Sequence, residues 1–210
     1  MIGIINYGSG NLSAFVNVFK SLEKKTMIID NPDDLKKCSH IVMPGVSAWN
    51  TTMQSVNRFK NPDTLLDCVF NKKLPFLGVC VGMQILASSS EEGSMDGLKW
   101  IEGKVRRLPV DQMPQNNSFL GPKLPHMGWN TVMGNTNTDL MARLPENPEF
   151  YFLHSYFFDA ANRNNIAAKA KYIGFSFPVV VQNENIFGVQ FHPEKSHING
   201  KILLENFSNL

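Results

Sequence analysis

The chain has 210 residues, of which 43% are hydrophobic, and its formal net charge at neutral pH is +2. Length and apolar content of this order are typical of one globular domain with a large core, so we expect a single domain over residues 1–210. The small net charge and the scattered lysines argue against a nucleic-acid-binding surface.

Strands and helices are predicted to alternate over the first half of the chain. The pattern gives, in chain order, a strand over 1–7, a helix over 12–24, strands over 26–30 and 40–45, a helix over 62–72, a strand over 75–79 and a helix over 81–89. Asn11 stands where its side chain can cap the first of these helices. This alternation predicts a parallel sheet with helices on both faces.

The second half is predicted to be rich in strands. Short polar turns separate six strand-like segments, at 99–108, 126–132, 149–158, 166–173, 177–183 and 186–191, and a last helix fits 200–209. The Pro-, Asn- and Gln-rich stretch 109–125 is expected to be a surface loop. The predicted fold class is therefore α/β: an open, mostly parallel sheet flanked by helices, with additional antiparallel strands in the C-terminal half and a nucleophile elbow after a central strand.

The three cysteines, Cys38, Cys68 and Cys80, show no C-x-x-C spacing. This argues against a disulfide framework and against a structural zinc site. The first residues lack a basic region followed by a long apolar one, and no apolar run reaches the length of a membrane span. We expect a cytoplasmic protein with reduced thiols.

Four clusters of small or polar residues follow predicted strands: 7–11, 44–46, 78–82 and 192–194. In an open parallel sheet, sites form at the carboxyl ends of the strands. We therefore expect these four clusters to lie near one another and to contain the functional residues.

The cluster Gly78-Val79-Cys80-Val81-Gly82 has the spacing of a nucleophile elbow. There the nucleophile takes a strained backbone between strand and helix, and a Cβ two residues to either side would collide with the turn. A helix that begins next to Cys80 would also stabilise a thiolate. The alternative is a buried, unreactive cysteine beside two glycines.

A cysteine nucleophile usually needs a base and a group that orients the base. His192 and Glu194 end the last predicted strand, and residues two apart on a strand face the same way. Glu194 is thus able to accept a hydrogen bond from one imidazole nitrogen of His192 while the other nitrogen faces Cys80. The backbone N–H of Val81 and the loop around Gly45 are the expected oxyanion donors. His192 taken alone fits an ordinary hydrogen-bonded histidine equally well.

The segment GVCVGMQ followed by FHPEKS resembles the class I glutamine amidotransferases. With NYGSGN, PGVSAW, PHMGWN and FYFLHSY, the resemblance covers essentially the whole chain and points to the branch that serves histidine biosynthesis. It implies that Cys80 attacks the side-chain amide of glutamine to form a glutamyl thioester, that His192 transfers protons and that Glu194 orients it.

The resemblance also implies which other residues form the site. Substrate contacts fall on Gly45, Val46, Val81, Gln84, His154, Ser155 and Tyr156, and contacts with a partner subunit on Asn11, Trp129 and Lys195. For Trp129 the plainer alternative is core packing, and for Gln84 it is a solvent-facing position on a helix.

No cofactor is expected, because the chain has no ATP-binding phosphate loop and Gly8-x-Gly10 lacks the third glycine of a dinucleotide fingerprint. The proposed glutaminase residues take up positions up to 194, which leaves little chain for a second active site. Ammonia must then pass to another chain. The resemblance implies that the heterodimer partner is a (β/α)₈-barrel cyclase subunit.

Some positions depart from the family pattern. Asn6 replaces the usual Asp, Ser47 and Trp49 replace the glycine and phenylalanine of the oxyanion loop, and His197 stands where small or acidic residues are commoner. These changes leave open an alternative: a paralogous glutaminase that supplies ammonia for amidation of a cell-surface sugar. A cysteine peptidase and a catalytically inactive interaction subunit remain as rival readings.

Overall fold

The computed structural model describes residues 1–59, 62–112, 123–134 and 138–210. Within these ranges the main sheet has nine strands in the order β2-β1-β3-β4-β12-β11-β10-β7-β8. Five neighbours run parallel: β2 (Thr26–Ile29), β1 (Ile2–Ile5), β3 (His40–Gly45), β4 (Phe76–Cys80) and β12 (Ile186–Val189). Four strands continue the sheet antiparallel: β11 (Phe175–Asn183), β10 (Ile166–Tyr172), β7 (His126–Gly134) and β8 (Glu149–His154).

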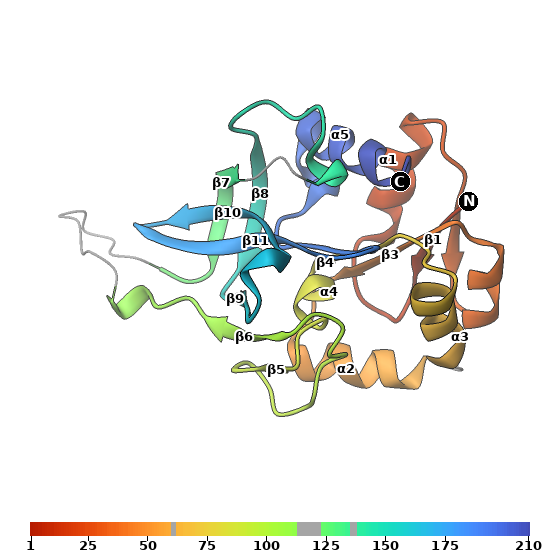
Figure 1. Ribbon diagram of the computed structural model, residues 1–210, viewed down its shortest axis with the longest axis horizontal. Helices are drawn as coiled ribbons and strands as arrows, with labels where there is room; N and C mark the ends of the chain where they lie inside the picture. The colour runs from red at the N-terminus through yellow and green to blue at the C-terminus, as the bar shows by residue number, and fades with distance from the viewer. Residues whose placement is uncertain (60–61, 113–122, 135–137) are drawn as a thin grey trace.

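Helices cover both faces of the parallel strands (Figure 1). On one side lie α1 (Leu12–Ser21) and α5 (His197–Phe207), and on the other α2 (Trp49–Arg58) and α3 (Pro62–Leu66), which continues into a π-helical turn. Every residue of β1, β3, β4 and β12 is buried. Strands covered on both faces are apolar throughout rather than alternating, which explains their continuous apolar runs in the sequence.

A second sheet of three strands lies beside the main one: β5 (Ser89–Ser90), β6 (Gly103–Arg107) and β9 (Tyr156–Ala160). The α/β fold with a large sheet flanked by helices is confirmed. The additional antiparallel strands of the C-terminal half are confirmed as well, and they make the sheet a mixed one, because all four strands beyond β12 run antiparallel to their neighbours.

The helix predicted over 81–89 is much shorter, since α4 spans only Val81–Gln84. The carbonyls of Ile85, Leu86 and Ala87 accept hydrogen bonds from backbone N–H groups at 98–101 instead of continuing the helix. The same pairing keeps residues 99–102 out of the strand predicted over 99–108, which begins only at Gly103.

The single strand predicted over 149–158 is two strands. β8 pairs with β7 in the main sheet and β9 pairs with β6 in the second sheet, and Ser155 forms the break between them. Helix α2 was not predicted, and α5 begins three residues earlier than expected. Most of the loop predicted over 109–125 falls on residues 113–122, outside the described residues.

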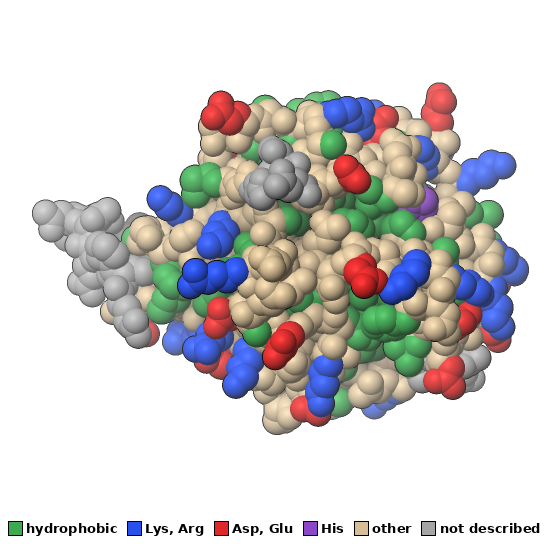
Figure 2. All heavy atoms as spheres, in the orientation of Figure 1, with side chains coloured by type: hydrophobic (Ala, Val, Ile, Leu, Met, Phe, Trp, Pro, Cys, Tyr) green, Lys and Arg blue, Asp and Glu red, His purple; other side chains and the backbone are tan. Residues whose placement is uncertain are grey.

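The side chains on the face drawn in Figure 2 carry interspersed acidic and basic groups. No helix in the part of the chain that the structure describes is long and apolar enough to cross a membrane.

Candidate active site

The turn after β4 holds Cys80 in a strained conformation, with φ 55° and ψ −112°. Few residues other than glycine adopt a positive φ, and strain of this kind persists where the surroundings enforce it. The two flanking glycines permit the turn: a Cβ on Gly78 would lie 2.3 Å from the Gly82 carbonyl oxygen, and a Cβ on Gly82 would lie 2.0 Å from that of Met43. Only glycine fits at either position.

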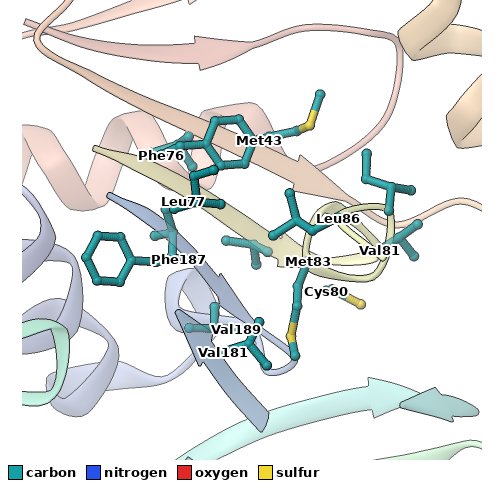
Figure 3. Close-up of a cluster of buried hydrophobic side chains, with 14 of the residues drawn as sticks. Met43, Phe76, Leu77, Cys80, Val81, Met83, Leu86, Val181, Phe187 and Val189 are labelled. Carbon is teal, nitrogen blue, oxygen red and sulfur yellow. The ribbon is translucent and has the colours of Figure 1, made fainter. Parts of the chain in front are cut away.

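Cys80 stands at the end of β4 above a tightly packed apolar cluster (Figure 3). Val81 and Met83 come from α4, and Val181 and Val189 come from β11 and β12. The side chains of Met83, Val181 and Val189 are fully buried. A close-packed floor of this kind resists rearrangement, so the cluster fixes the backbone that carries the thiol.

His192 lies across from Cys80 because β12 pairs in parallel with β4, with Val189 opposite Val79. His192 Nδ1 is 2.9 Å from Glu194 Oε1, and the side chains of the two residues are 3% and 2% exposed. The other carboxylate oxygen, Oε2, is buried and makes no hydrogen bond with the described residues. Cys80 and His192 line the same cavity of about 720 Å³.

Burial alone would lower the pKa of His192, since it disfavours the charged ring. The nearby sulfur of Cys80 and the hydrogen-bonded carboxylate of Glu194 outweigh burial and raise the pKa of His192 to about 10. At neutral pH the ring is therefore an imidazolium beside the sulfur. An imidazolium beside a cysteine sulfur is the arrangement that activates cysteine nucleophiles.

The expected oxyanion loop lies next to the cysteine, with Gly45 of β3 opposite Cys80 of β4. Val46 lines the cavity, but its backbone N–H donates to Ser9 Oγ at 3.1 Å. Ser47 Oγ donates to the same Ser9 Oγ at 3.1 Å. In this conformation Ser9, which lies in the predicted cluster 7–11 but was given no role of its own, accepts the hydrogen bond that the Val46 N–H was expected to offer to substrate.

The predicted substrate residues Val81, Gln84, His154, Ser155 and Tyr156 all line the cavity. Gln84 Nε2 donates to the Tyr156 carbonyl at 3.0 Å and to Gln190 Oε1 at 3.1 Å. Gln84 is only 3% exposed, so the alternative of a solvent-facing helix residue is wrong.

His154 belongs to a buried histidine pair that the sequence did not reveal. Its Nδ1 lies 2.8 Å from the Tyr156 carbonyl oxygen, and its Nε2 lies 2.9 Å from Nδ1 of His126. Burial lowers the pKa of His126 to about 4 and that of His154 to about 3, so both rings are neutral at pH 7. Since both nitrogens of His154 are engaged, the ring supports the cavity wall and offers substrate no free nitrogen.

Of the three residues expected at a partner interface, two line the cavity. These are Asn11 and Lys195, and Asn11 also caps α1 by accepting a hydrogen bond from the Ala14 N–H. Trp129 is 47% exposed, which excludes plain core packing, and its ring stacks on His197 with centroids 5.0 Å apart. Lys195 Nζ lies 5.7 Å from the ring centroid of Tyr151.

Two further buried polar residues belong to this region, Gln190 and His126. Gln190 is fully buried, and its Nε2 lies 3.8 Å from Cys80 Sγ. Its sequence signal is a glutamine between apolar neighbours just before the His192 motif. For His126 the only signal is its place in PHMGWN. Among the described residues, no group of three or more His, Cys, Asp or Glu side chains is placed to hold a metal ion.

Comparisons with known proteins identify the family of the chain. A family model described as glutamine amidotransferase class-I matches residues 3–209. The chain is 49% identical to the imidazole glycerol phosphate synthase subunit HisH of Leptospira interrogans and 42% identical to that of Bdellovibrio bacteriovorus, each over 210 residues and 100% of both chains.

Solved structures share the fold at low sequence identity. The structure of PurLQS from Thermotoga maritima superposes with a TM-score of 0.74 and 15% identity, over 99% of this chain and 97% of that one. A glutamine amidotransferase from the same organism gives a TM-score of 0.63 and 17% identity over 99% and 82%. The family match and the full-length relatives confirm the resemblance found in the sequence: the chain belongs to the class I glutamine amidotransferases, a family of enzymes.

Proposed function

We propose that the chain is the glutaminase subunit of an imidazole glycerol phosphate synthase, and that it hydrolyses L-glutamine to glutamate and ammonia for histidine biosynthesis. The observation that carries this proposal is the similarity to HisH subunits, at 42–49% identity over the whole of both chains. The same similarity favours histidine biosynthesis over the surface-sugar alternative.

In the proposed first half-reaction, the Cys80 thiolate attacks the side-chain carbonyl carbon of glutamine. The amide oxygen becomes negative and accepts a hydrogen bond from the N–H of Val81. Because Nδ1 of His192 is engaged with Glu194, Nε2 is the nitrogen that passes a proton to the amide nitrogen. The C–N bond then breaks, ammonia leaves, and a glutamyl thioester remains on Cys80.

In the second half-reaction, the neutral His192 accepts a proton from water through Nε2 as the water oxygen attacks the thioester carbon. The C–S bond breaks, glutamate leaves, and the thiolate–imidazolium pair is restored. Glu194 holds the ring through Nδ1 throughout. Val46 joins the oxyanion hole only when its N–H exchanges Ser9 Oγ for the substrate oxygen.

The proposed partner is a (β/α)₈-barrel cyclase subunit that receives the ammonia. Support comes from an apolar face on β7 and β8, where Met127 pairs with Leu153 and Trp129 pairs with Tyr151. Met127, Trp129 and Leu153 are 65%, 47% and 38% exposed, and Leu153 also lines the cavity. Contiguous exposed apolar side chains mark interaction surfaces, and this face leads directly to the proposed site of ammonia release.

The proposed setting is the cytoplasm. All three cysteines of the chain are free thiols, the state that a reducing compartment maintains.

The test is Cys80→Ala, assayed in complex with the cyclase subunit of the same organism. We expect glutamine-dependent synthesis to be lost and synthesis from added ammonium salts to persist, because only the source of ammonia is removed. Cys68→Ala is the matched control, since Cys68 is buried but does not line the cavity. Retained glutamine-dependent synthesis, or loss of both activities in an intact complex, would contradict the assignment of Cys80. If the unmodified chain hydrolyses glutamine but does not bind the cyclase, only the assignment to histidine biosynthesis is contradicted.

A further inference from the structure

A buried chain of side-chain amides connects the wall of the cavity with the sulfur of Cys80. Gln190 follows β12 and is fully buried. Its Oε1 accepts from Gln84 Nε2 at 3.1 Å, and its own Nε2 lies 3.8 Å from Cys80 Sγ. Gln84 in turn donates to the carbonyl of Tyr156 at 3.0 Å. Three residues distant in sequence thus meet at the nucleophile.

The orientation of both amides follows from the Tyr156 carbonyl, which is able only to accept. Gln84 must present its NH₂ group to this oxygen, and the same NH₂ group faces Gln190. Gln190 must therefore present its oxygen to Gln84, which turns its NH₂ group toward Cys80. Reversing either amide would set two acceptors or two donors against each other.

The carbonyl that fixes this order is itself held by the histidine pair. Tyr156 O also lies 2.8 Å from Nδ1 of His154, so this nitrogen carries the hydrogen, and Nε2 of His154 then accepts from Nδ1 of His126. Both rings are neutral and buried. The direction of every hydrogen bond from His126 to Gln190 is consequently determined.

We infer that Gln190 is a positioning residue for the nucleophile: its Nε2–H donates to the sulfur of Cys80, favours the thiolate over the thiol and holds the sulfur toward the cavity. The inference rests on the proposed role of Cys80. A thiol sulfur is a weak acceptor, whereas a hydrogen bond to an ionised acceptor is about twice as strong as a neutral one, so the donor stabilises the charged form selectively. Burying a glutamine for packing alone would cost free energy that a leucine or methionine would not.

Other ionisable groups also act on Cys80. His192 faces it directly with Glu194 behind, Tyr7 interacts with it electrostatically, and Glu92 and Lys195 line the same cavity. The thiol of Cys80 also lies 3.9 Å from the Leu153 carbonyl oxygen. All of these groups remain when Gln190 is replaced, so a difference between variant and unmodified chain reports on the amide.

The experiment compares Gln190→Met, which removes the donor at similar volume, with Gln190→Glu, which keeps the shape and puts a carboxyl group beside the sulfur. The rate of Cys80 alkylation by iodoacetamide is measured against pH on the full chain, with the modified site identified by mass spectrometry. At neutral pH we expect a loss of about tenfold for Gln190→Met and a larger loss for Gln190→Glu, with both half-maximal points moved to higher pH. In complex with the cyclase subunit, kcat for glutamine should fall by a similar factor and KM should change less.

Gln182→Met is the matched control, because Gln182 lies on β11 and its side chain bonds to the Glu184 carbonyl, away from the cavity. Its alkylation profile should equal that of the unmodified chain. Gln190 variants that fold and keep the unmodified profile would overturn the inference, even if they are less stable. Absence of glutaminase activity in the unmodified complex would instead overturn the proposed function.

A measurement on the unmodified chain covers the case in which Gln190 variants do not fold. The side-chain ¹⁵N amide signal of Gln190 should shift when Cys80 is alkylated, and the signal of Gln182 should not. An unchanged Gln190 signal on a fully alkylated chain would overturn the inference.

Discussion

Two regions of the molecule bury histidine to the same depth and give it opposite charge. His192, at the carboxyl end of β12, is 3% exposed, and the pair on β7 and β8, His126 and His154, is 3% and 6% exposed. The pKa of His192 is raised to about 10, whereas the pKa values of His126 and His154 are lowered to about 4 and about 3. At similar burial, the neighbours therefore decide which histidine is charged.

The neighbours differ in charge. His192 meets the buried carboxylate of Glu194, which stabilises an imidazolium. The pair meets only neutral groups: the Tyr156 carbonyl, the other ring, and the amide nitrogen of Asn130, which lies 3.1 Å from His126 Nε2. The charged surroundings of His192 are suited to proton transfer, and the neutral surroundings of the pair are suited to holding the wall of the cavity in place.

The largest effect is expected from Glu194→Gln, which gives His192 only neutral hydrogen-bond partners, as His126 and His154 have. The amide keeps a hydrogen bond to Nδ1 but removes the charge, so the pKa of His192 should fall and the imidazolium needed by the leaving ammonia should be lost. We expect kcat for glutamine hydrolysis in the complex to fall about 10²- to 10⁴-fold, the usual contribution of a positioned acid–base group. Ammonium-dependent synthesis serves as the control. A loss below tenfold would show that the charge of Glu194 is not needed.

The next largest effect is expected in the dependence of folding stability on pH. The histidine pair and His192 should change the stability in opposite directions as the pH changes. In the unfolded chain each imidazole takes up a proton near pH 6.5, whereas the folded pair does so only near 4 and 3. The pair therefore contributes fully to the free energy of unfolding above pH 6.5. As the pH falls below this value, its contribution decreases by about 1.4 kcal/mol per pH unit for each proton. His40, whose pKa is also lowered by burial, acts in the same direction.

His192 acts in the opposite direction, because its pKa is raised. Its contribution to the free energy of unfolding is complete below about pH 6.5 and is lost as the pH rises toward 10. Urea denaturation between pH 5 and 6.5 tests the first sign, in a window above the titration of most carboxylates. Stability that rises as the pH falls through this window would contradict the neutral pair.

A smaller effect is expected from His126→Phe, which keeps an aromatic ring between β7 and β8 but leaves His154 Nε2 without its donor. An unpaired buried acceptor costs about 1–3 kcal/mol, so the urea midpoint should decrease. The slope of stability against pH should also decrease, since one of the titrating rings is gone. His197→Phe is the control, because His197 is exposed and stacks on Trp129 at the surface. Equal stability of the His126 and His197 variants would mean that the pair does not stabilise the fold.

The sequence predicted the His192 region far better than the histidine pair, for a physical reason. Gly78, Gly82 and Cys80 are linked by the local geometry of one turn. His192 and Glu194 are only two residues apart, although they meet through the 3₁₀ turn Pro193–Lys195 after β12 and not through the strand alternation that was predicted. Local relations of this kind leave a pattern in sequence. The chemistry and the partner came from the family resemblance and not from spacing.

The contacts that sequence reasoning missed join residues far apart in the chain. His126 and His154 are 28 positions apart and meet through the β7–β8 register, and Gln190 and Cys80 are 110 positions apart. The early end of α4 at Gln84 has the same origin, because backbone groups at 98–101 take the carbonyls that follow it. No local periodicity records which distant partner will satisfy a buried polar group.

The smallest effect is expected at an ion pair that is shorter than the one at His192. Lys73 Nζ lies 2.6 Å from Glu184 Oε2, against 2.9 Å between His192 and Glu194, but the two surface side chains are 55% and 67% exposed. Water screens such a pair and both side chains lose entropy on forming it, so it stabilises little. Lys73→Met should leave the urea midpoint and kcat for glutamine unchanged at physiological salt. A change as large as that of His126→Phe would mean that the separation of the charges matters more than their burial, and the contrast between the two histidine regions would then need another cause.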